Sequence, residues 1–214
     1  KEPTAQIICD LNYPSGEPSK IAPRQVLKNI IRQLSDENLR AVVAPELEFY
    51  LCEQNLDPDL PLKTPVGKSG RRETGSRVFG IDAVNEFDKL TDDIYDYCEL
   101  MNIGVDTLVH ESGPSQIEIN LNHGDPLALA DQAFMFKRAV RQVALKHNIH
   151  ATFMAKPYQG QPGSSMHIHQ NLVSAKTGEN LFSDKEGNNS KEFFRFIGGL
   201  QTYLPMPCFC LRLT

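Results

Sequence analysis

Two histidines stand one residue apart in the stretch GSSMHIHQNL, which runs from Gly163 to Leu172. If this stretch forms a β-strand, residues at positions i and i+2 project from the same face, so His167 and His169 point into one space. Two charged imidazoles placed side by side repel one another. A metal ion or a phosphate group in that space would keep them neutral or give them a partner, and we therefore expect one of the two.

Four glutamates raise a similar question. Glu46 and Glu48 share one face of a predicted strand over 41–51, Glu118 lies within a second predicted strand, and Glu111 stands just before a turn. Glutamate is depleted in central strands, although a single glutamate is common on an exposed sheet face. If these strands and the histidine strand belong to one sheet, that face is lined with carboxylate oxygens and imidazole nitrogens.

The charge of this cluster narrows the chemistry. The negative charges of four carboxylates equal the positive charges of two divalent cations. Oxygen ligands suit Mg²⁺ or Mn²⁺ better than Zn²⁺, which prefers nitrogen and sulfur. Magnesium held by several carboxylates generally accompanies phosphate groups, whose charge the metal neutralises. The residues thus point to ATP as the cofactor.

The composition excludes several other classes of protein. The chain has 214 residues with 22 Lys and Arg against 27 Asp and Glu, a net charge of −5, so it lacks the basic excess of a nucleic-acid-binding protein. The sequence shows neither an apolar run long enough for a membrane span nor a signal peptide. Its 5 cysteines form no CxxC pair, which favours reduced thiols and a cytoplasmic location. The Cys208-x-Cys210 pair near the end makes a poor zinc site.

The periodicity of apolar residues and the turn residues predict the helices and strands that position these side chains. Helical spacing predicts helices over 23–34, 86–101, 125–144 and 190–204. Strands are predicted over 5–11, 41–51, on both sides of the Gly113-Pro114 turn, over 149–157 and at the histidine pair. Residues 55–80 form a long surface loop, whose basic residues either meet an anion or are simply solvated. This order predicts an α+β fold with a mainly antiparallel sheet backed by helices on one face.

Three segments, PELEFYL, HESGPSQIEINL and FMAKPYQGQPGSSMHIHQNL, together resemble the catalytic domain of the glutamine synthetase family. The resemblance extends from about Thr4 to Leu204. It implies a metal-lined funnel formed by the antiparallel sheet, with residues 1–214 as a partial catalytic domain. The small N-terminal β-grasp domain and the C-terminal part of the catalytic domain are then expected to be absent. Family members phosphorylate the γ-carboxylate of glutamate with ATP in the presence of Mg²⁺ or Mn²⁺, and an amine then displaces the phosphate.

The resemblance also implies a role for each member of the cluster. Glu48, Glu111 and Glu118 match the ligands of the metal beside the substrate pocket. Glu46 and His167 match ligands of the metal that bridges the ATP phosphates, which also places His167 beside the substrates.

Two further positions match the family motif. His169 matches the catalytic histidine that lies near the transferred phosphate of ATP, and Gly163 matches a backbone position that touches the glutamate substrate. One imidazole would thus bind a metal while the other faces phosphate, so the two need not both be charged.

Within the family, the segment GQPGSSMHIHQ is most similar to the branch that makes γ-glutamylpolyamines. Ammonia-using members typically carry Asn-Gly where this chain has Pro162-Gly163. The missing asparagine favours a bulkier acceptor such as putrescine or spermidine over ammonia. Active sites shared between neighbouring subunits imply a homo-oligomer.

The sequence is also compatible with two alternative functions. The final segment MPCFCLRLT departs from the family pattern, and the arginines that grip the glutamate carboxylate and the ATP phosphates lie beyond it, which predicts little or no activity for this chain alone. The alternative is therefore an inactive remnant with a metal-binding or assembly role. A metal-dependent hydrolase is a third possibility, but His110, His123, His147 and His150 are most simply surface or loop residues.

Overall fold

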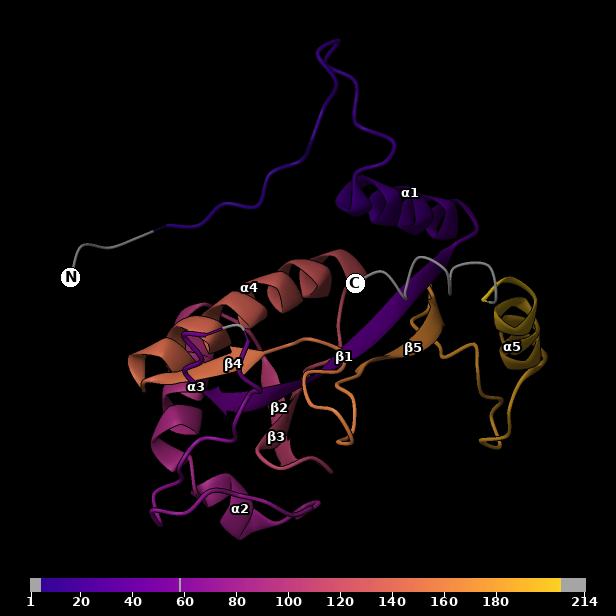
Figure 1. The fold of residues 1–214 in the computed structure, drawn as a ribbon. Helices are drawn as coiled ribbons and strands as arrows, with labels where there is room; N and C mark the ends of the chain where they lie inside the picture. The colour runs from indigo at the N-terminus through magenta and orange to yellow at the C-terminus, as the bar shows by residue number, and fades with distance from the viewer. Residues whose placement is uncertain (1–4, 58, 205–214) are drawn as a thin grey trace. The chain divides into compact units, whose positions relative to one another are not determined.

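The computed structural model describes residues 5–57 and 59–204 (Figure 1). The helices of these residues are α1 (Pro23–Asp36), α2 (Ile81–Asn85), α3 (Asp88–Leu100), α4 (Pro126–Lys146) and α5 (Lys191–Tyr203). The strands are β1 (Leu39–Glu53), β2 (Val105–His110), β3 (Gln116–Leu121), β4 (Ile149–Thr152) and β5 (Met166–Ser174). None of the helices in the described ranges is long and apolar enough to cross a membrane.

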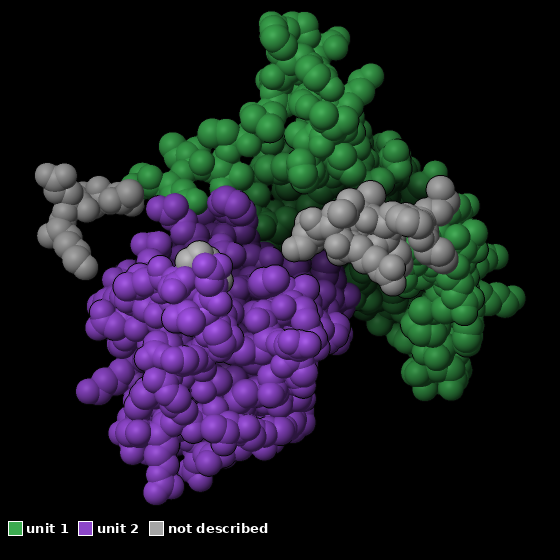
Figure 2. All heavy atoms as spheres, viewed as in Figure 1, with its two compact units in different colours: residues 1–43, 124–131, 170–205 green, residues 44–123, 132–169, 206–214 purple. Residues whose placement is uncertain are grey.

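The chain divides into two compact units, coloured separately in Figure 2. The first unit comprises residues 1–43, 124–131 and 170–205, and the second comprises residues 44–123, 132–169 and 206–214. Every residue that the sequence predicts for the site belongs to the second unit. The site can therefore be described within that unit alone.

The sheet is built around β1. Its strands follow the order β2-β3-β1-β4, and β5 also pairs with β1. The pairs β1–β3, β1–β4 and β2–β3 are antiparallel. In the register of β1 and β3, Glu48 lies opposite Glu118 and Glu46 lies opposite Asn120. Three strands that are distant in the sequence thus bring their polar residues to one place.

Alternation along β1 separates an apolar face from a polar one. Leu47, Phe49 and Leu51 are at most 1% exposed. The ring of Phe49 lies 5.1 Å from that of Phe153, which in turn lies 6.4 Å from the ring of Phe136 on α4, measured between ring centroids. Because side chains alternate along a strand, Glu46 and Glu48 project to the opposite face of the sheet. The core therefore fixes the orientation of the acidic residues.

Helices α4 and α5 each begin at a side-chain cap. The carboxylate of Asp125 accepts hydrogen bonds from the backbone N–H groups of Leu127 (3.0 Å) and Ala128 (2.9 Å) at the start of α4. The hydroxyl of Ser190 accepts one from the N–H of Phe193 (3.1 Å) at the start of α5. Both helices begin where the sequence predicts because these oxygens satisfy N–H groups that lack a partner within the helix.

Three sequence predictions about structure are wrong: the strand over 5–11, the surface or loop position of His110, and the extent of the strand over 149–157, which ends at Thr152. Residues 5–11 form no strand, and Ile7 is 81% exposed. A strand needs a neighbour for its backbone groups, and no strand of the described residues pairs with this segment. His110 is not a surface residue but ends β2 at 1% exposure, and His150 lies within β4. The Cys208-x-Cys210 pair lies outside the described residues.

Candidate metal centre

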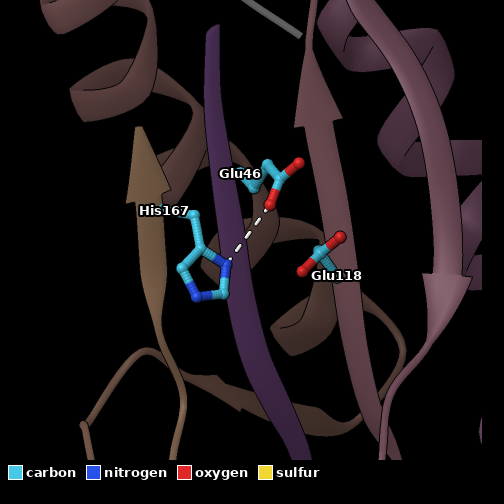
Figure 3. A group of neighbouring side chains, drawn as sticks. All are labelled: Glu46, Glu118 and His167. Atoms are coloured by element: carbon cyan, nitrogen blue, oxygen red, sulfur yellow. Dashed lines mark ion pairs between the residues drawn. The ribbon is translucent and has the colours of Figure 1, made fainter. Parts of the chain in front are cut away.

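Three of the five predicted metal ligands converge on the polar face of the sheet. Glu46 of β1, Glu118 of β3 and His167 of β5 each offer one ligand atom, and these atoms all lie within 4.8 Å of one another (Figure 3). The Nδ1 atom of His167 is 3.2 Å from an oxygen of Glu46. Opposed ligand atoms around one Mg²⁺ are about 4 Å apart, given metal–oxygen distances of about 2.1 Å. The atoms are therefore close enough to bind divalent cations after small movements of the side chains.

Glu48, a fourth predicted metal ligand, lies beside this group and is held in place through one of its oxygens. Its Oε2 atom accepts hydrogen bonds from the side-chain amide of Gln116 (2.9 Å) and from the backbone N–H of Ser165 (3.0 Å). Its Oε1 atom lies 3.9 Å from Nδ1 of His167. Because both bonds are made to Oε2, the other oxygen remains for a ligand on the polar face.

Glu111, the fifth predicted ligand, lies just after β2 and does not join the group within 4.8 Å. Its backbone N–H donates to the carbonyl of Gln116 (2.8 Å), and its side chain accepts from the N–H of Ser112 (3.1 Å). The charge of Glu111 nevertheless contributes, after burial and Glu46, to raising the pKa of Glu118. Glu111 is thus at the edge of the cluster.

The cluster accumulates negative charge in a buried setting. Glu118 is 9% exposed, and burial raises its pKa, with further contributions from the charges of Glu46, Glu111 and Glu48. Burial, helped by Glu48 and Glu111, likewise raises the pKa of Tyr50 to about 12. In the described ranges, no lysine or arginine forms an ion pair with any of these four glutamates. Their donor set and unbalanced charge fit a divalent cation.

The two histidines of β5 reach the same carboxylate. Nε2 of His169 lies 2.6 Å from one oxygen of Glu46, while His167 approaches the other oxygen. Their side chains are 67% and 59% exposed, respectively. The prediction that both imidazoles point into one space is therefore confirmed.

Gly163 lies directly beside this cluster. Its carbonyl accepts a hydrogen bond from the amide of Gln116 (3.0 Å), the same amide that bonds Glu48. A Cβ atom at Gly163 would lie 2.8 Å from the carbonyl oxygen of Ala155, closer than side chains tolerate. The glycine lets the loop between β4 and β5 approach its own preceding segment.

Sequence analysis missed two polar residues that shape the site. Gln116 is fully buried, and its signal is a glutamine inside a buried strand, where an amide needs hydrogen-bond partners. Glu73 lies in the predicted surface loop 55–80, where a glutamate carries no distinctive sequence signal. Its Oε2 atom lies 2.9 Å from Nε2 of His110 and accepts a bond from the N–H of Ser115 (2.6 Å). The buried position of His110 is explained by this carboxylate.

The basic residues of the same loop are partly engaged elsewhere. Lys68 pairs with Asp88 at 2.7 Å, and Arg72 pairs with Glu53 at 2.9 Å. These pairs are at the surface and leave the two cations neutralised by neighbouring carboxylates. The loop therefore contributes Glu73 to the neighbourhood of the cluster, while Lys68 and Arg72 form ion pairs elsewhere.

Comparison with known proteins identifies the family. Residues 20–212 match the family model described as the catalytic domain of glutamine synthetase. The chain therefore belongs to the glutamine synthetase family, as its sequence motifs predict.

Three curated relatives illustrate the range of this family. The gamma-glutamylputrescine synthetase of Escherichia coli is 39% identical over 202 residues, which are 94% of this chain and 43% of that protein. The glutamine synthetase of Pyrococcus abyssi is 35% identical over 188 residues (88% and 40%). The glutamate–isopropylamine ligase of a Pseudomonas species is 30% identical over 206 residues (94% and 43%). The chain thus spans about two fifths of the length of these relatives.

Solved structures confirm the fold class. The structure of a GmaS/ADP complex superimposes with a TM-score of 0.75 at 28% identity, covering 89% of this chain and 42% of that one. The α+β architecture with a mostly antiparallel sheet is therefore that of the glutamine synthetase family.

Proposed function

We propose that this chain is part of an ATP-dependent ligase that joins the γ-carboxylate of glutamate to an amine. The convergence of Glu46, Glu118 and His167 within 4.8 Å, in a chain of the glutamine synthetase family, is the observation that supports this most directly. We further propose that residues 1–214 are a portion of the catalytic domain. The β-grasp domain and the remainder of the catalytic domain would then complete the working enzyme.

The proposed ligands form two neighbouring sets. Glu48, Glu111 and Glu118 would hold one divalent cation, and Glu46 and His167 would hold a second. Bound Mg²⁺ or Mn²⁺ would supply positive charge that neutralises the phosphates of ATP and the carboxylate of glutamate. The buried and unbalanced charge around Glu118 supports this assignment, because a cation offsets it.

The residues of the chain would then position the reacting groups. The exposed ring of His169, whose Nε2 atom contacts Glu46, would face the transferred phosphate, and the backbone at Gly163 would hold the glutamate substrate. An oxygen of the glutamate γ-carboxylate attacks the terminal phosphorus of ATP, and ADP leaves. The amine nitrogen then attacks the carbonyl carbon of the γ-glutamyl phosphate, inorganic phosphate leaves, and the amine loses one proton.

An alkylamine is the acceptor that we propose, with putrescine as the first choice. The greater identity to the gamma-glutamylputrescine synthetase (39%) than to the glutamine synthetase (35%) favours it. The side chain of Pro162, whose carbonyl accepts a bond from the Tyr50 hydroxyl (2.8 Å), has no amide to hydrogen-bond a small ammonium ion. A hydrocarbon chain would be better accommodated there than ammonia.

Phosphate release from ATP tests this proposal in the complete protein that contains this chain. Reactions with glutamate and Mg²⁺ or Mn²⁺ would receive putrescine, ammonia or no amine. Putrescine-stimulated release, together with a γ-glutamylputrescine product, is the expected result. Stimulation by ammonia alone would identify ammonia as the acceptor. Metal binding without any amine-dependent turnover would contradict the proposed ligase activity and favour an inactive remnant.

A further inference from the structure

One fully buried side chain connects three parts of the candidate site. Gln116 of β3 is 0% exposed, and its Nε2 atom donates to Oε2 of Glu48 (2.9 Å) and to the carbonyl of Gly163 (3.0 Å). Its Oε1 atom accepts from the backbone N–H of Gly113 (2.9 Å). A side-chain amide has two N–H donors and one oxygen, so every group of this amide is engaged.

The three partners have different places in the proposed reaction. Glu48 is a proposed metal ligand, and Gly163, whose backbone would hold the glutamate substrate, belongs to the segment 163–165. Gly113 lies two residues after Glu111, in the turn between β2 and β3. Gln116 itself belongs to none of the proposed ligand sets, so any effect on the reaction would be exerted through these neighbours.

A second bond strengthens the connection between Glu48 and the segment 163–165. The backbone N–H of Ser165 donates to the same Oε2 atom at 3.0 Å. The N–H of Ser164 is fixed as well, by the carbonyl of Ala155 at 2.9 Å. A displacement of this segment therefore cannot leave the Glu48 carboxylate where it is, because both contact the amide of Gln116.

We propose that Gln116 is a positioning residue that couples the cation site to the glutamate-binding segment 163–165, an inference that rests on the proposed function. By holding Oε2 of Glu48, it orients Oε1 toward the cation. By holding the carbonyl of Gly163, it sets the position of the segment. Binding of glutamate and binding of the cation then change one another's affinity by the same factor.

The chemistry of the amide explains why other side chains would fail here. Methionine has a similar length but donates no hydrogen bond, so the carbonyl of Gly163 would lose the amide and Oε2 of Glu48 would keep only the N–H of Ser165. Glutamate would replace the donor with an oxygen beside the oxygen of Glu48, and two carboxylates in contact repel. Asparagine is one methylene shorter and cannot reach both acceptors from the same backbone position.

The first experiment uses the complete protein that contains this chain and has two readouts. Free Mn²⁺ is followed by electron paramagnetic resonance during a titration, and hydrogen exchange is measured on the peptide that contains Ser164 and Ser165. In Gln116→Met we expect Mn²⁺ affinity to fall by about 10- to 100-fold, the loss typical of an outer-shell partner. We also expect faster exchange of that peptide without metal, because the segment has lost its anchor.

A matched control separates positioning from general stability. Ile117 is the next residue on β3, is 1% exposed and faces the opposite side of the sheet. Ile117→Val should lower the urea midpoint of unfolding, because it removes a buried methyl group, while leaving both readouts unchanged. Should Gln116→Met fail to fold by circular dichroism, Gln116→Asn would replace it, because it keeps a polar amide but shortens the reach.

The second experiment measures the coupling in the complete protein. The ratio of Mn²⁺ affinities with and without glutamate should differ from one in the wild type and return to about one in Gln116→Met. Unchanged Mn²⁺ affinity and exchange in Gln116→Met, or equal losses in Ile117→Val, would overturn the inference and leave the ligase intact. A wild-type chain that binds no Mn²⁺ would instead overturn the metal site and the inference together.

Discussion

At the scale of single residues, the carboxylate of Glu118 illustrates a conflict between stability and binding. It is buried opposite Glu48 in the register of the sheet, and its pKa is raised by burial and by three neighbouring glutamates. A carboxylate in such a place destabilises the metal-free fold when ionised, since its charge is poorly solvated and repelled. The same charge is what a divalent cation requires.

This conflict predicts a definite pH dependence. Because the folded pKa of Glu118 is raised above 4.5, its contribution to stability is present below that pH and is lost as the pH rises through the folded pKa. In EDTA, the free energy of unfolding should fall less in Glu118→Gln than in the wild type as the pH rises from 5 to 7. Urea unfolding at each pH measures this.

The same substitution should act in the opposite direction on metal binding. Glu118→Gln removes a proposed ligand, so Mn²⁺ affinity should fall by about 100-fold or more, beyond the loss typical of an outer-shell partner. Glu192→Gln serves as the control, because Glu192 forms only an exposed pair with Arg195. Equal effects of the two substitutions on stability and affinity would show that Glu118 has no special position.

Gly163 gives a second prediction at the residue scale. In Gly163→Ala, the new Cβ would stand 2.8 Å from the carbonyl of Ala155, so the segment 163–165 must shift. In the complete protein we expect kcat/KM for glutamate to fall by about 10- to 100-fold, the effect of a small misplacement of a substrate-binding group. Gly198→Ala in α5 is the matched control, because its Cβ would meet no atom within 4 Å. A normal kcat/KM in Gly163→Ala would contradict the proposed role.

At the scale of elements, the sequence predicts most helices and the strands of the central sheet. Asp125 and Pro126 mark the beginning of α4, and Ser190 marks that of α5, because local capping decides where these helices start. The alternation of Glu46 and Glu48 with apolar residues correctly indicates that both glutamates lie on one face of β1, where His167 approaches both. These features depend only on neighbours in the sequence.

Features that depend on distant neighbours are the ones that sequence reasoning misses. The opposition of Glu48 and Glu118 is a matter of register between strands, which no local pattern specifies. The bonds of Gln116 and the ion pair of Glu73 with His110 join residues from separate elements. The strand predicted over 5–11 is wrong for the same reason, since a strand also needs a partner.

The cap of α5 gives a prediction at this scale. The hydroxyl of Ser190 accepts from the N–H of Phe193 and donates to the carbonyl of Leu181. Ser190→Ala should lower the free energy of unfolding by about 1 kcal/mol, measured by urea denaturation, whereas Ser190→Thr should retain most of the cap. A neutral Ser190→Ala would show that α5 begins independently of this hydroxyl.

At the scale of the whole molecule, cation binding should appear as stability. A ligand that binds only the folded state stabilises it by about 2.7 kcal/mol at 100 times its Kd. For a chain of this size, that corresponds to a rise in Tm of roughly 5 to 10 °C. Calorimetry should show this rise with Mn²⁺ and its reversal by EDTA in the wild type. Glu118→Gln should show neither, and a Tm insensitive to Mn²⁺ and Mg²⁺ would contradict the proposed centre.

The division into two units has a consequence for how the protein is made. Each unit is assembled from separate stretches of sequence, and the chain passes between them within β1, α4 and β5. The bond between Glu48 and Ser165 spans 117 positions. A nascent chain emerging from the ribosome therefore cannot close its central sheet until β5 has been synthesised. Until then β1 lacks the partner strand β5, so slow translation or early release should favour aggregation and a need for chaperones.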